Sequence, residues 1–183
     1  LGPRLNAVGR LGKADAAVEL LCTSDRNRAE SLAAALDEVN QERQELTKRM
    51  AQEAEAMAVA NGFDQDDRRC VILCGDDWHP GVVGIVASRM VERFGRPAIL
   101  LSREDNVLRG SARSIDGYSI HAGIASAKAH VQKFGGHDMA AGLSLAADQF
   151  EAFTDAVLQH AQCIKPEDLT PALRVGADAT LLE

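Results

Sequence analysis

The longest regular pattern of hydrophobic and polar positions lies between residues 25 and 61. Hydrophobic residues recur there at alternating steps of three and four residues: Leu32, Leu36, Val39, Leu46, Met50 and Met57. This spacing predicts one long amphipathic helix, capped by Ser24 or Asp25 and ending at Asn61-Gly62. Arg43 and Glu53 interrupt the series. Because the hydrophobic stripe is narrow, we expect the helix to pack against little.

Two interpretations of this helix remain open, a coiled-coil segment and a rigid strut between two domains. The hydrophobic seam lasts for few heptads and is broken twice, which favours the strut. Before it, residues 1–13 are rich in Gly and Arg and predict a loop, and residues 14–22 predict a short helix. The chain opens at Leu1 without an initiator Met, so we expect it to be a piece of a longer protein.

After a polar loop at residues 63–68, short apolar runs alternate with amphipathic segments. The predicted strands cover residues 69–74, 98–102, 107–114 and 143–145, and the predicted helices cover residues 81–94, 119–133 and 148–162. Strands and helices that alternate at this length predict an α/β fold with a central mixed sheet. Pro166 and Pro171 would end this unit, and the residues after them resemble the first strand of another.

Composition limits the class of protein. The chain has 183 residues, of which 46% are hydrophobic, with a net charge of −7. These values fit a folded, soluble protein with one main domain. No hydrophobic run reaches the roughly 18 residues of a membrane span, and no signal peptide is evident, so we expect a cytoplasmic protein without a membrane partner. The cysteines show no framework spacing, and Cys70 and Cys74 are expected in a core rather than in a zinc or disulfide site.

The net negative charge argues against a protein that coats nucleic acid along its whole surface. Two stretches are nevertheless locally basic. Residues 1–13 carry three basic residues and no acidic one, and residues 103–133 carry five basic residues against three acidic ones.

The run Arg109-Gly110-Ser111-Ala112-Arg113 alternates long basic and short residues. On a strand, Arg109, Ser111 and Arg113 would share one face, where two guanidinium groups and a hydroxyl could hold a phosphate. The alternative is a solvated edge strand. Gly110 and Ala112 leave the other face too small to fill a core, which favours the phosphate site.

The run FGGHDMAAG places Gly135, Gly136 and His137 next to another small-residue step. We expect a loop in which bare backbone lets a phosphate or sugar approach a titratable imidazole. A purely structural role for His137 is the alternative.

The run DDWHPGVVG joins a predicted strand to a predicted helix but lacks the spacing of a dinucleotide-binding loop. Gly81 and Gly84 would either leave the helix N-terminus open to an anion or allow tight packing. His79 would bond backbone or substrate, and Trp78 would stack on a base or fill the core. No P-loop, Ser-His-Asp pattern or Asp/His cluster is present, so we expect neither catalytic residues nor a metal site within this chain.

Four motifs in series resemble the DHH phosphoesterase superfamily, and within it the RecJ family of bacterial single-strand-specific exonucleases. They are GPRLNAVGRLG, WHPGVVGIVASRMVERFGRPAILL, LRGSARSI and KFGGHDMAAGLSL. The resemblance covers nearly the whole chain. It implies the end of a DHH catalytic domain at residues 1–22, a connecting helix at 23–62, a DHHA1 domain at 63–165 and the start of an OB-fold at 166–183.

The resemblance also implies site residues. Ser111 and Arg113, with Arg109 beside them, would bind a terminal 5′-phosphate. Gly135, Gly136 and His137 would bind substrate next to two Mn²⁺ or Mg²⁺ ions held by a DHH domain that this chain lacks. Arg4 and Asn6 would lie at the edge of the catalytic cleft.

The implied function is that of a 5′→3′ single-stranded DNA exonuclease in recombination and repair, to which this chain would contribute the lobe that grips the strand. Single-stranded DNA is the implied substrate, a single-strand-binding protein and a helicase are implied partners, and a monomer is expected. The alternatives are a phosphoesterase for short oligonucleotides or nucleotides, and a non-catalytic nucleic-acid-binding module.

Overall fold

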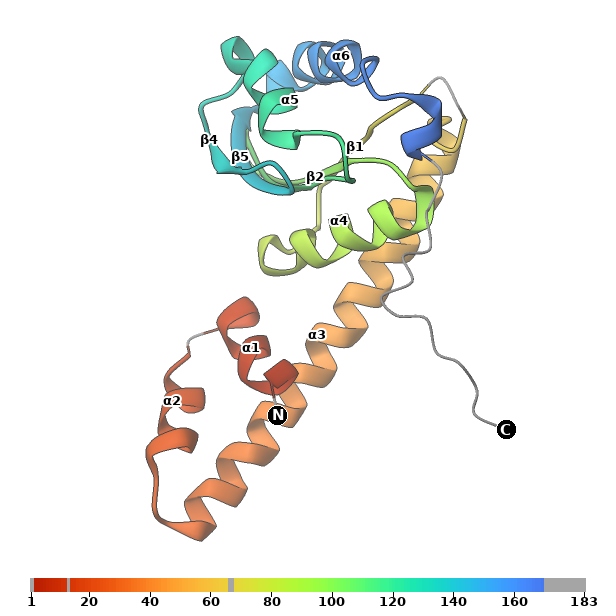
Figure 1. The fold of residues 1–183 in the computed structure, drawn as a ribbon. Coiled ribbons are helices and arrows are strands. Elements are labelled where there is room, and N and C mark those ends of the chain that lie inside the picture. Colours follow the sequence, from red (N-terminus) through yellow and green to blue (C-terminus); the bar gives the residue numbers. More distant parts are fainter. Residues whose placement is uncertain (1, 13, 66–67, 170–183) are drawn as a thin grey trace, which may run out of the picture.

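A small helical unit and an α/β lobe lie near opposite ends of one long helix (Figure 1). The computed structural model describes residues 2–12, 14–65 and 68–169. The helical unit consists of α1 (Gly2–Leu11) and α2 (Asp15–Cys22), which pack on the first half of α3 (Arg26–Ala60). The lobe occupies the other half of α3. Within the described residues, no helix is both long enough and apolar enough to cross a bilayer.

Helix α1 replaces the loop that we predicted for residues 1–13. Its Ala7 and Val8 are buried, and Val8 packs in a small core with Ala17 and Leu36. Glycine weakens an isolated helix, so the glycine content of this segment favoured a loop. Burial of one face against α3 supplies the stabilisation that the local sequence lacks.

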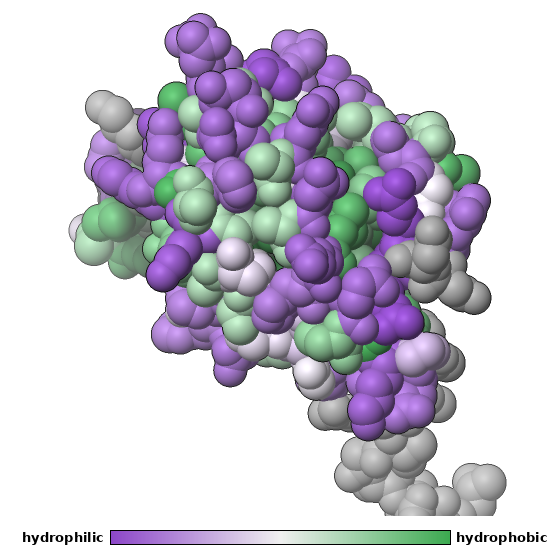
Figure 2. Space-filling view, turned by 90° about the horizontal axis from the view of Figure 1, so that it is seen from above, coloured by the Kyte–Doolittle hydropathy of each residue, from purple (hydrophilic) through white to green (hydrophobic). Residues whose placement is uncertain are grey.

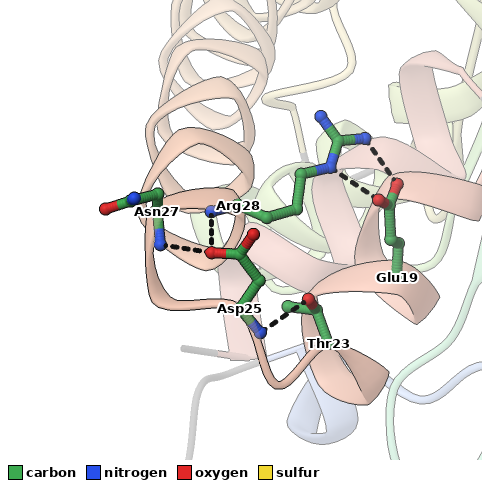
Figure 3. Close-up of polar contacts among 5 residues, drawn as sticks. All are labelled: Glu19, Thr23, Asp25, Asn27 and Arg28. Atoms are coloured by element: carbon green, nitrogen blue, oxygen red, sulfur yellow. Dashed lines mark hydrogen bonds and ion pairs between the residues drawn. The ribbon is translucent and has the colours of Figure 1, made fainter.

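The corner between α2 and α3 is held by polar side chains (Figure 3). Asp25 caps α3, and its carboxylate accepts hydrogen bonds from the backbone N–H groups of Asn27 and Arg28. The Arg28 guanidinium forms two hydrogen bonds with the Glu19 carboxylate, at 2.6 and 2.8 Å. This contact lowers the pKa of Glu19. The predicted start of the long helix, at Ser24 or Asp25, is thus confirmed at Asp25.

Helix α3 packs along most of its length, contrary to our expectation that it would pack against little. Leu32 and Leu36 are buried on the side of α1 and α2, whereas Met50, Ala54 and Ala58 are buried in the core of the lobe. The two apolar regions share one seam, so α3 joins two packed units.

The lobe contains a mixed sheet, as predicted, but with five strands rather than the four expected. Its elements are β1 (Val71–Gly75), α4 (Pro80–Phe94), β2 (Ala98–Glu104), β3 (Val107–Arg113), α5 (Ile120–Ser126), β4 (Lys133–His137), β5 (Ala140–Ala146) and α6 (Phe150–Ala161). The strand order is β1-β2-β3-β5-β4, in which β1 and β2 are parallel and the other pairs are antiparallel. Short 3₁₀ turns lie at Lys128–His130, Ala147–Gln149 and Pro166–Leu169.

Helices cover both faces of this sheet (Figure 1). Helix α4 and the end of α3 lie on one face, and α5 and α6 lie on the other. The core between them includes Ile99, Leu100, Leu145 and Phe153, all fully buried. Viewed from the side of α5 and α6, hydrophilic residues spread over the surface, with hydrophobic areas between them (Figure 2).

Two predictions around the last strands are wrong. The helix predicted over residues 119–133 ends at Ser126, because the chain turns back there to form β4. The predicted Gly135-Gly136-His137 loop belongs to β4, which pairs with a β5 of seven residues rather than three. Two glycines in a row suggest a loop when strand propensity alone is considered, but the neighbouring strand supplies the pairing. The strand expected after Pro171 lies outside the described residues.

Candidate functional site

The side chains of Arg109, Ser111 and Arg113 lie on one face of β3, as their alternation predicted. The alternate positions face the α5 and α6 side, where Ala112 and Leu108, the residue before Arg109, are fully buried. Our expectation that this opposite face is too small to fill a core is therefore wrong. Gly110 is needed there because a Cβ atom would come within 2.2 Å of the Leu100 carbonyl oxygen.

Strand pairing places this face of β3 beside the corresponding faces of β5 and β4. Residues that pair directly across antiparallel strands point to the same side of a sheet. The register defines three rows across β3, β5 and β4, which we call the basic face: Arg109, Ser144 and Lys133; Ser111, Gly142 and Gly135; Arg113, Ala140 and His137. The structure thus brings Arg109, Ser111 and Arg113 next to Gly135 and His137, which lie in a segment more than twenty positions further along the sequence.

Beside Ser111, the middle row of the basic face is bare backbone at Gly142 and Gly135. A Cβ atom at Gly135 would meet nothing within 4 Å, and one at Gly142 would make only an ordinary contact with the Gly110 carbonyl oxygen, at 3.8 Å. Neither glycine has a positive φ. Since packing and backbone conformation would both accept a side chain at these positions, the absence of one leaves the surface open to a ligand.

Gly136 is a glycine for a different reason. Its φ is +144°, and a Cβ atom there would lie 2.4 Å from the Ala140 carbonyl oxygen and 2.6 Å from the Ala141 Cα. The hairpin between β4 and β5 therefore requires glycine at this position, and Gly136 supports the face without forming part of its open surface.

A cavity of about 310 Å³ lies over the basic face. Its walls are β3, β5 and β4 on the sheet side and the first turns of α4 on the other side. The lining residues include Pro80, Val83, Arg109, Ser111, Lys133 and Ser144. Because α4 covers only part of this side of the sheet, the cavity opens where the helix stops covering the strands.

Two arginines, Arg113 of β3 and Arg10 of α1, lie beside α4. Arg113 is about half-buried, and its pKa is lowered first by burial and then by the positive charge of Arg10. Arg10 reaches this position from α1, where its Nη1 donates a hydrogen bond to the Gly81 carbonyl oxygen at 3.3 Å. Among the described residues neither guanidinium has a carboxylate partner. An anion placed between them would relieve their mutual repulsion.

The other charged groups of the basic face differ in their partners. Arg109 forms an ion pair with Glu104 at 3.0 Å, so part of its charge is balanced. His137 is exposed at the end of β4, and no hydrogen bond joins its ring to the residues that the structure describes. The next residue, Asp138, accepts a hydrogen bond from Ser119 at 2.5 Å and ties the hairpin to the start of α5.

Arg4 and Asn6 do not join the basic face. Arg4 forms an ion pair with Asp37 that holds α1 on α3. Asn6 is exposed on α1 and lines a separate crevice between α1, α3 and α4.

Sequence reasoning missed Arg10, Lys133 and Ser144. Lys133 alternates with Gly135 and His137, a period-2 signal that the strand assignment would have used. The pairing of Ser144 with Lys133 then places Ser144 on the same face. Arg10 carries no comparable signal, since its place beside Arg113 depends on how α1 packs against α4.

The sequence left two roles open, structural or ligand-binding, for Trp78, His79 and Gly81 at the start of α4, and the structure favours the structural role for each. Trp78 is buried, so it is not available to stack on a base. The His79 Nδ1 accepts a hydrogen bond from the Gly81 backbone N–H at 3.0 Å and caps α4. Gly81 permits close packing, because a Cβ atom there would lie 1.9 Å from the Arg10 carbonyl oxygen.

The donor set for a catalytic metal is not found in the described part of the chain. No group of three or more His, Cys, Asp or Glu side chains converges there in a way that could hold an ion. Cys70 is buried and Cys74 half-buried beside the core. The residues of the basic face instead offer hydrogen-bond donors and positive charge, which suit a phosphate.

Comparison with known proteins identifies the family. Residues 67–162 match the model of the DHHA1 domain. A single-stranded-DNA-specific exonuclease RecJ from Bacillus subtilis is 46% identical over 150 residues, which cover 81% of this chain and 19% of the relative. The RecJ of Dickeya dadantii is 43% identical over 167 residues, covering 84% of this chain and 28% of the relative.

A solved structure agrees with these matches. The crystal structure of RecJ from Thermus thermophilus in complex with Mn²⁺ superposes with a TM-score of 0.81 at 34% identity, covering 89% of this chain and 24% of that chain. The chain spans between 19% and 31% of the length of the curated relatives that it matches. The chain belongs to the DHHA1 domain family, in the form that this domain takes in RecJ proteins.

Proposed function

We propose that this chain is the strand-gripping part of a 5′→3′ single-stranded DNA exonuclease that acts in the cytoplasm in repair and recombination. The observation that carries the proposal is the basic face, where positive side chains surround a row of bare backbone. The names of the relatives, which are single-stranded-DNA-specific exonucleases, support the same substrate.

The geometry suggests how the strand is held. The Ser111 hydroxyl and the guanidinium groups of Arg113 and Arg10 bind the terminal 5′-phosphate. The sugar of the terminal nucleotide then lies on Gly142 and Gly135, and Lys133 contributes positive charge at the far side of the cavity. These groups contact phosphate and sugar rather than base edges, so the binding is independent of the DNA sequence.

Catalysis is assigned to residues outside this chain. The Thermus thermophilus relatives were solved with Mn²⁺ or Mg²⁺, whereas the described residues here do not fit a metal site. The roles that we propose for this chain are binding and orientation. His137, exposed on the rim of the basic face, faces the bound strand and can donate a hydrogen bond to it.

The test uses the full-length protein that contains this chain. Single strands labelled at the 5′ or the 3′ end are digested with Mn²⁺ or Mg²⁺, and the polarity is taken from the order in which label is released. Arg113→Gln should weaken the handling of 5′-phosphorylated strands by about 1–3 kcal/mol, the contribution of a charge-assisted hydrogen bond. Arg89→Gln, which changes an exposed arginine of α4, is the matched control.

Two results would overturn the proposal. One is unchanged cleavage and affinity in the Arg113→Gln variant. The other is robust Mn²⁺-dependent digestion of single strands by the pure 183-residue chain, because the proposal places catalysis elsewhere.

A further inference from the structure

Arg43 occupies a seam position of α3 where the packing of the helix favours an apolar residue. The buried seam runs through Leu36, Asn40, Thr47 and Met50, and Arg43 lies on the same stripe, three residues after Asn40 and four before Thr47. The seam is therefore polar between its two apolar halves. This polar segment faces the region where α1 approaches α4.

The surroundings of Arg43 offer it little compensation. Its Nη2 donates a hydrogen bond to the Asn40 Oδ1 at 2.9 Å. Its Nε is buried and has no hydrogen-bond partner among the described residues. A buried donor without an acceptor costs free energy, so packing within the seam does not explain an arginine at this position.

Arg43 lines a crevice of about 330 Å³ between α1, α3 and α4. The other lining residues are Gly2, Pro3, Asn6, Arg10 and Ile85. The crevice thus contains two guanidinium groups and an amide but no carboxylate. Such a set of donors matches the oxygens of a phosphate.

Arg10 connects this crevice with the basic face. It lines the crevice, it donates a hydrogen bond to the Gly81 carbonyl oxygen on α4, and its charge acts on Arg113. Arg10 therefore has Arg43 of α3 beside it in the crevice and Arg113 of β3 within reach of its charge.

We propose that Arg43, together with Asn6, binds an internal backbone phosphate of the same single strand whose terminal phosphate is held by Ser111, Arg113 and Arg10. This inference rests on the proposed function and adds a second phosphate site to it. The second site accounts for an arginine in the seam of α3, since a leucine would pack there without leaving a buried donor unpaired.

The test compares strands that can and cannot reach both sites. The 183-residue chain is titrated with 5′-phosphorylated, 3′-fluorescein-labelled oligothymidylate of ten nucleotides, and thymidine 5′-monophosphate is used as a competitor. The variants are Arg43→Leu, Arg113→Gln and Arg49→Leu. The last one removes an exposed arginine from α3 and serves as the control.

We expect Arg43→Leu to weaken binding of the ten-nucleotide strand by about 10- to 100-fold. The slope of log affinity against log salt should fall by about 0.7, the value for one phosphate contact to a single strand. The affinity for the monophosphate should not change, and the thermal midpoint should equal or exceed that of the wild type, because leucine suits the seam. Arg113→Gln should weaken both ligands.

The outcomes separate the two proposals. If Arg43→Leu binds the long strand as Arg49→Leu does while Arg113→Gln weakens it, the second site is wrong and the proposed function stands. A lower thermal midpoint with equal losses for both ligands would show that Arg43 has a structural role, and would also reject the second site. If the wild-type chain does not bind the phosphorylated strand, or Arg113→Gln binds it normally, both proposals are wrong.

Discussion

Gly135 and Gly136 are adjacent in β4 but have different structural reasons to be glycine. Space is open around Gly135, whereas Gly136 has φ +144° and close backbone neighbours. The sequence shows the pair but not this difference, because the difference depends on the side of the hairpin that each residue faces. Of the two, Gly135 alone leaves open space that a ligand can occupy.

This difference predicts opposite effects of one substitution. Gly135→Ala should change the free energy of unfolding by no more than about 0.5 kcal/mol and weaken single-strand binding several-fold, because its methyl group enters the bare row. Gly136→Ala should lower the free energy of unfolding by about 1–3 kcal/mol. Urea denaturation and strand titration measure the two effects. A destabilised Gly135→Ala variant that binds normally would contradict our account of the row.

The buried thiol of Cys70 should make the free energy of unfolding depend on pH. Burial raises the pKa of its thiol from 9.0 to about 12, so the folded state keeps the proton that the unfolded state loses above pH 9. The contribution of Cys70 to stability is therefore complete below pH 9 and is lost between pH 9 and pH 12. The loss is at most about 1.4 kcal/mol per pH unit for one group.

Urea midpoints measured from pH 7 to pH 10.5 test this dependence. The Cys70→Ala variant should lose less stability above pH 9 than the wild type does, and Cys163→Ala, at an exposed position, should follow the wild type. Burial also raises the pKa of Tyr118, so some alkaline loss should remain in every variant. Identical slopes for Cys70→Ala and wild type would rule out the thiol as a source.

At the scale of elements, the start of α3 is set by one carboxylate. Asp25 accepts hydrogen bonds from two backbone N–H groups of the first turn, and its side chain points towards them (Figure 3). Asp25→Ala should lower the free energy of unfolding by about 1 kcal/mol. Asn27→Ala is the control, because Asn27 contributes its backbone N–H to the cap. Equal effects of the two substitutions on the urea midpoint would show that the cap does not hold the helix start.

Elements with strong local signals were predictable from the sequence. Helices α3 and α4 and strands β1, β2 and β3 lie close to their predicted bounds, because hydrophobic periodicity and capping residues mark them. Helix α1 and strand β4 were not predictable in this way. Their glycines weaken the local signal, and tertiary contacts decide their structure: burial of Val8 against α3, and pairing of β4 with β5.

The residues of the candidate site also divide into those with a local sequence signal and those placed by tertiary contacts. Arg109, Ser111 and Arg113 were assigned to one face by period-2 alternation within a single strand. That Gly135 and His137 lie next to them depends on the β3-β5-β4 register, which joins segments far apart in the sequence. The position of Arg10 beside Arg113 depends in addition on the packing of α1 against α4.

At the scale of the whole molecule, the contact between α1 and α4 links the helical unit to the lobe. Gly81 allows this contact, since a Cβ atom would lie 1.9 Å from the Arg10 carbonyl oxygen. Gly81→Ala should push α1 away, move Arg10 from Arg113, weaken strand binding and lower the free energy of unfolding by about 1–3 kcal/mol.

The control for this prediction is Gly9→Ala on α1, where a Cβ atom would meet nothing within 4 Å. That change should stabilise the helix by about 0.5–1 kcal/mol and leave binding intact. Strand titration and thermal unfolding of both variants give the comparison. Normal binding by Gly81→Ala would show that strand binding does not depend on the position of Arg10.

The row formed by Ser111, Gly142 and Gly135 has a consequence for how an exonuclease would travel along its substrate. A track of main-chain atoms and one hydroxyl offers nothing that distinguishes a purine from a pyrimidine. The rate of degradation should therefore be nearly uniform along unstructured strands of any composition. Pauses should mark the places where the DNA folds back on itself, and a map of pause positions would reflect the hairpins of the substrate rather than a preference of the protein.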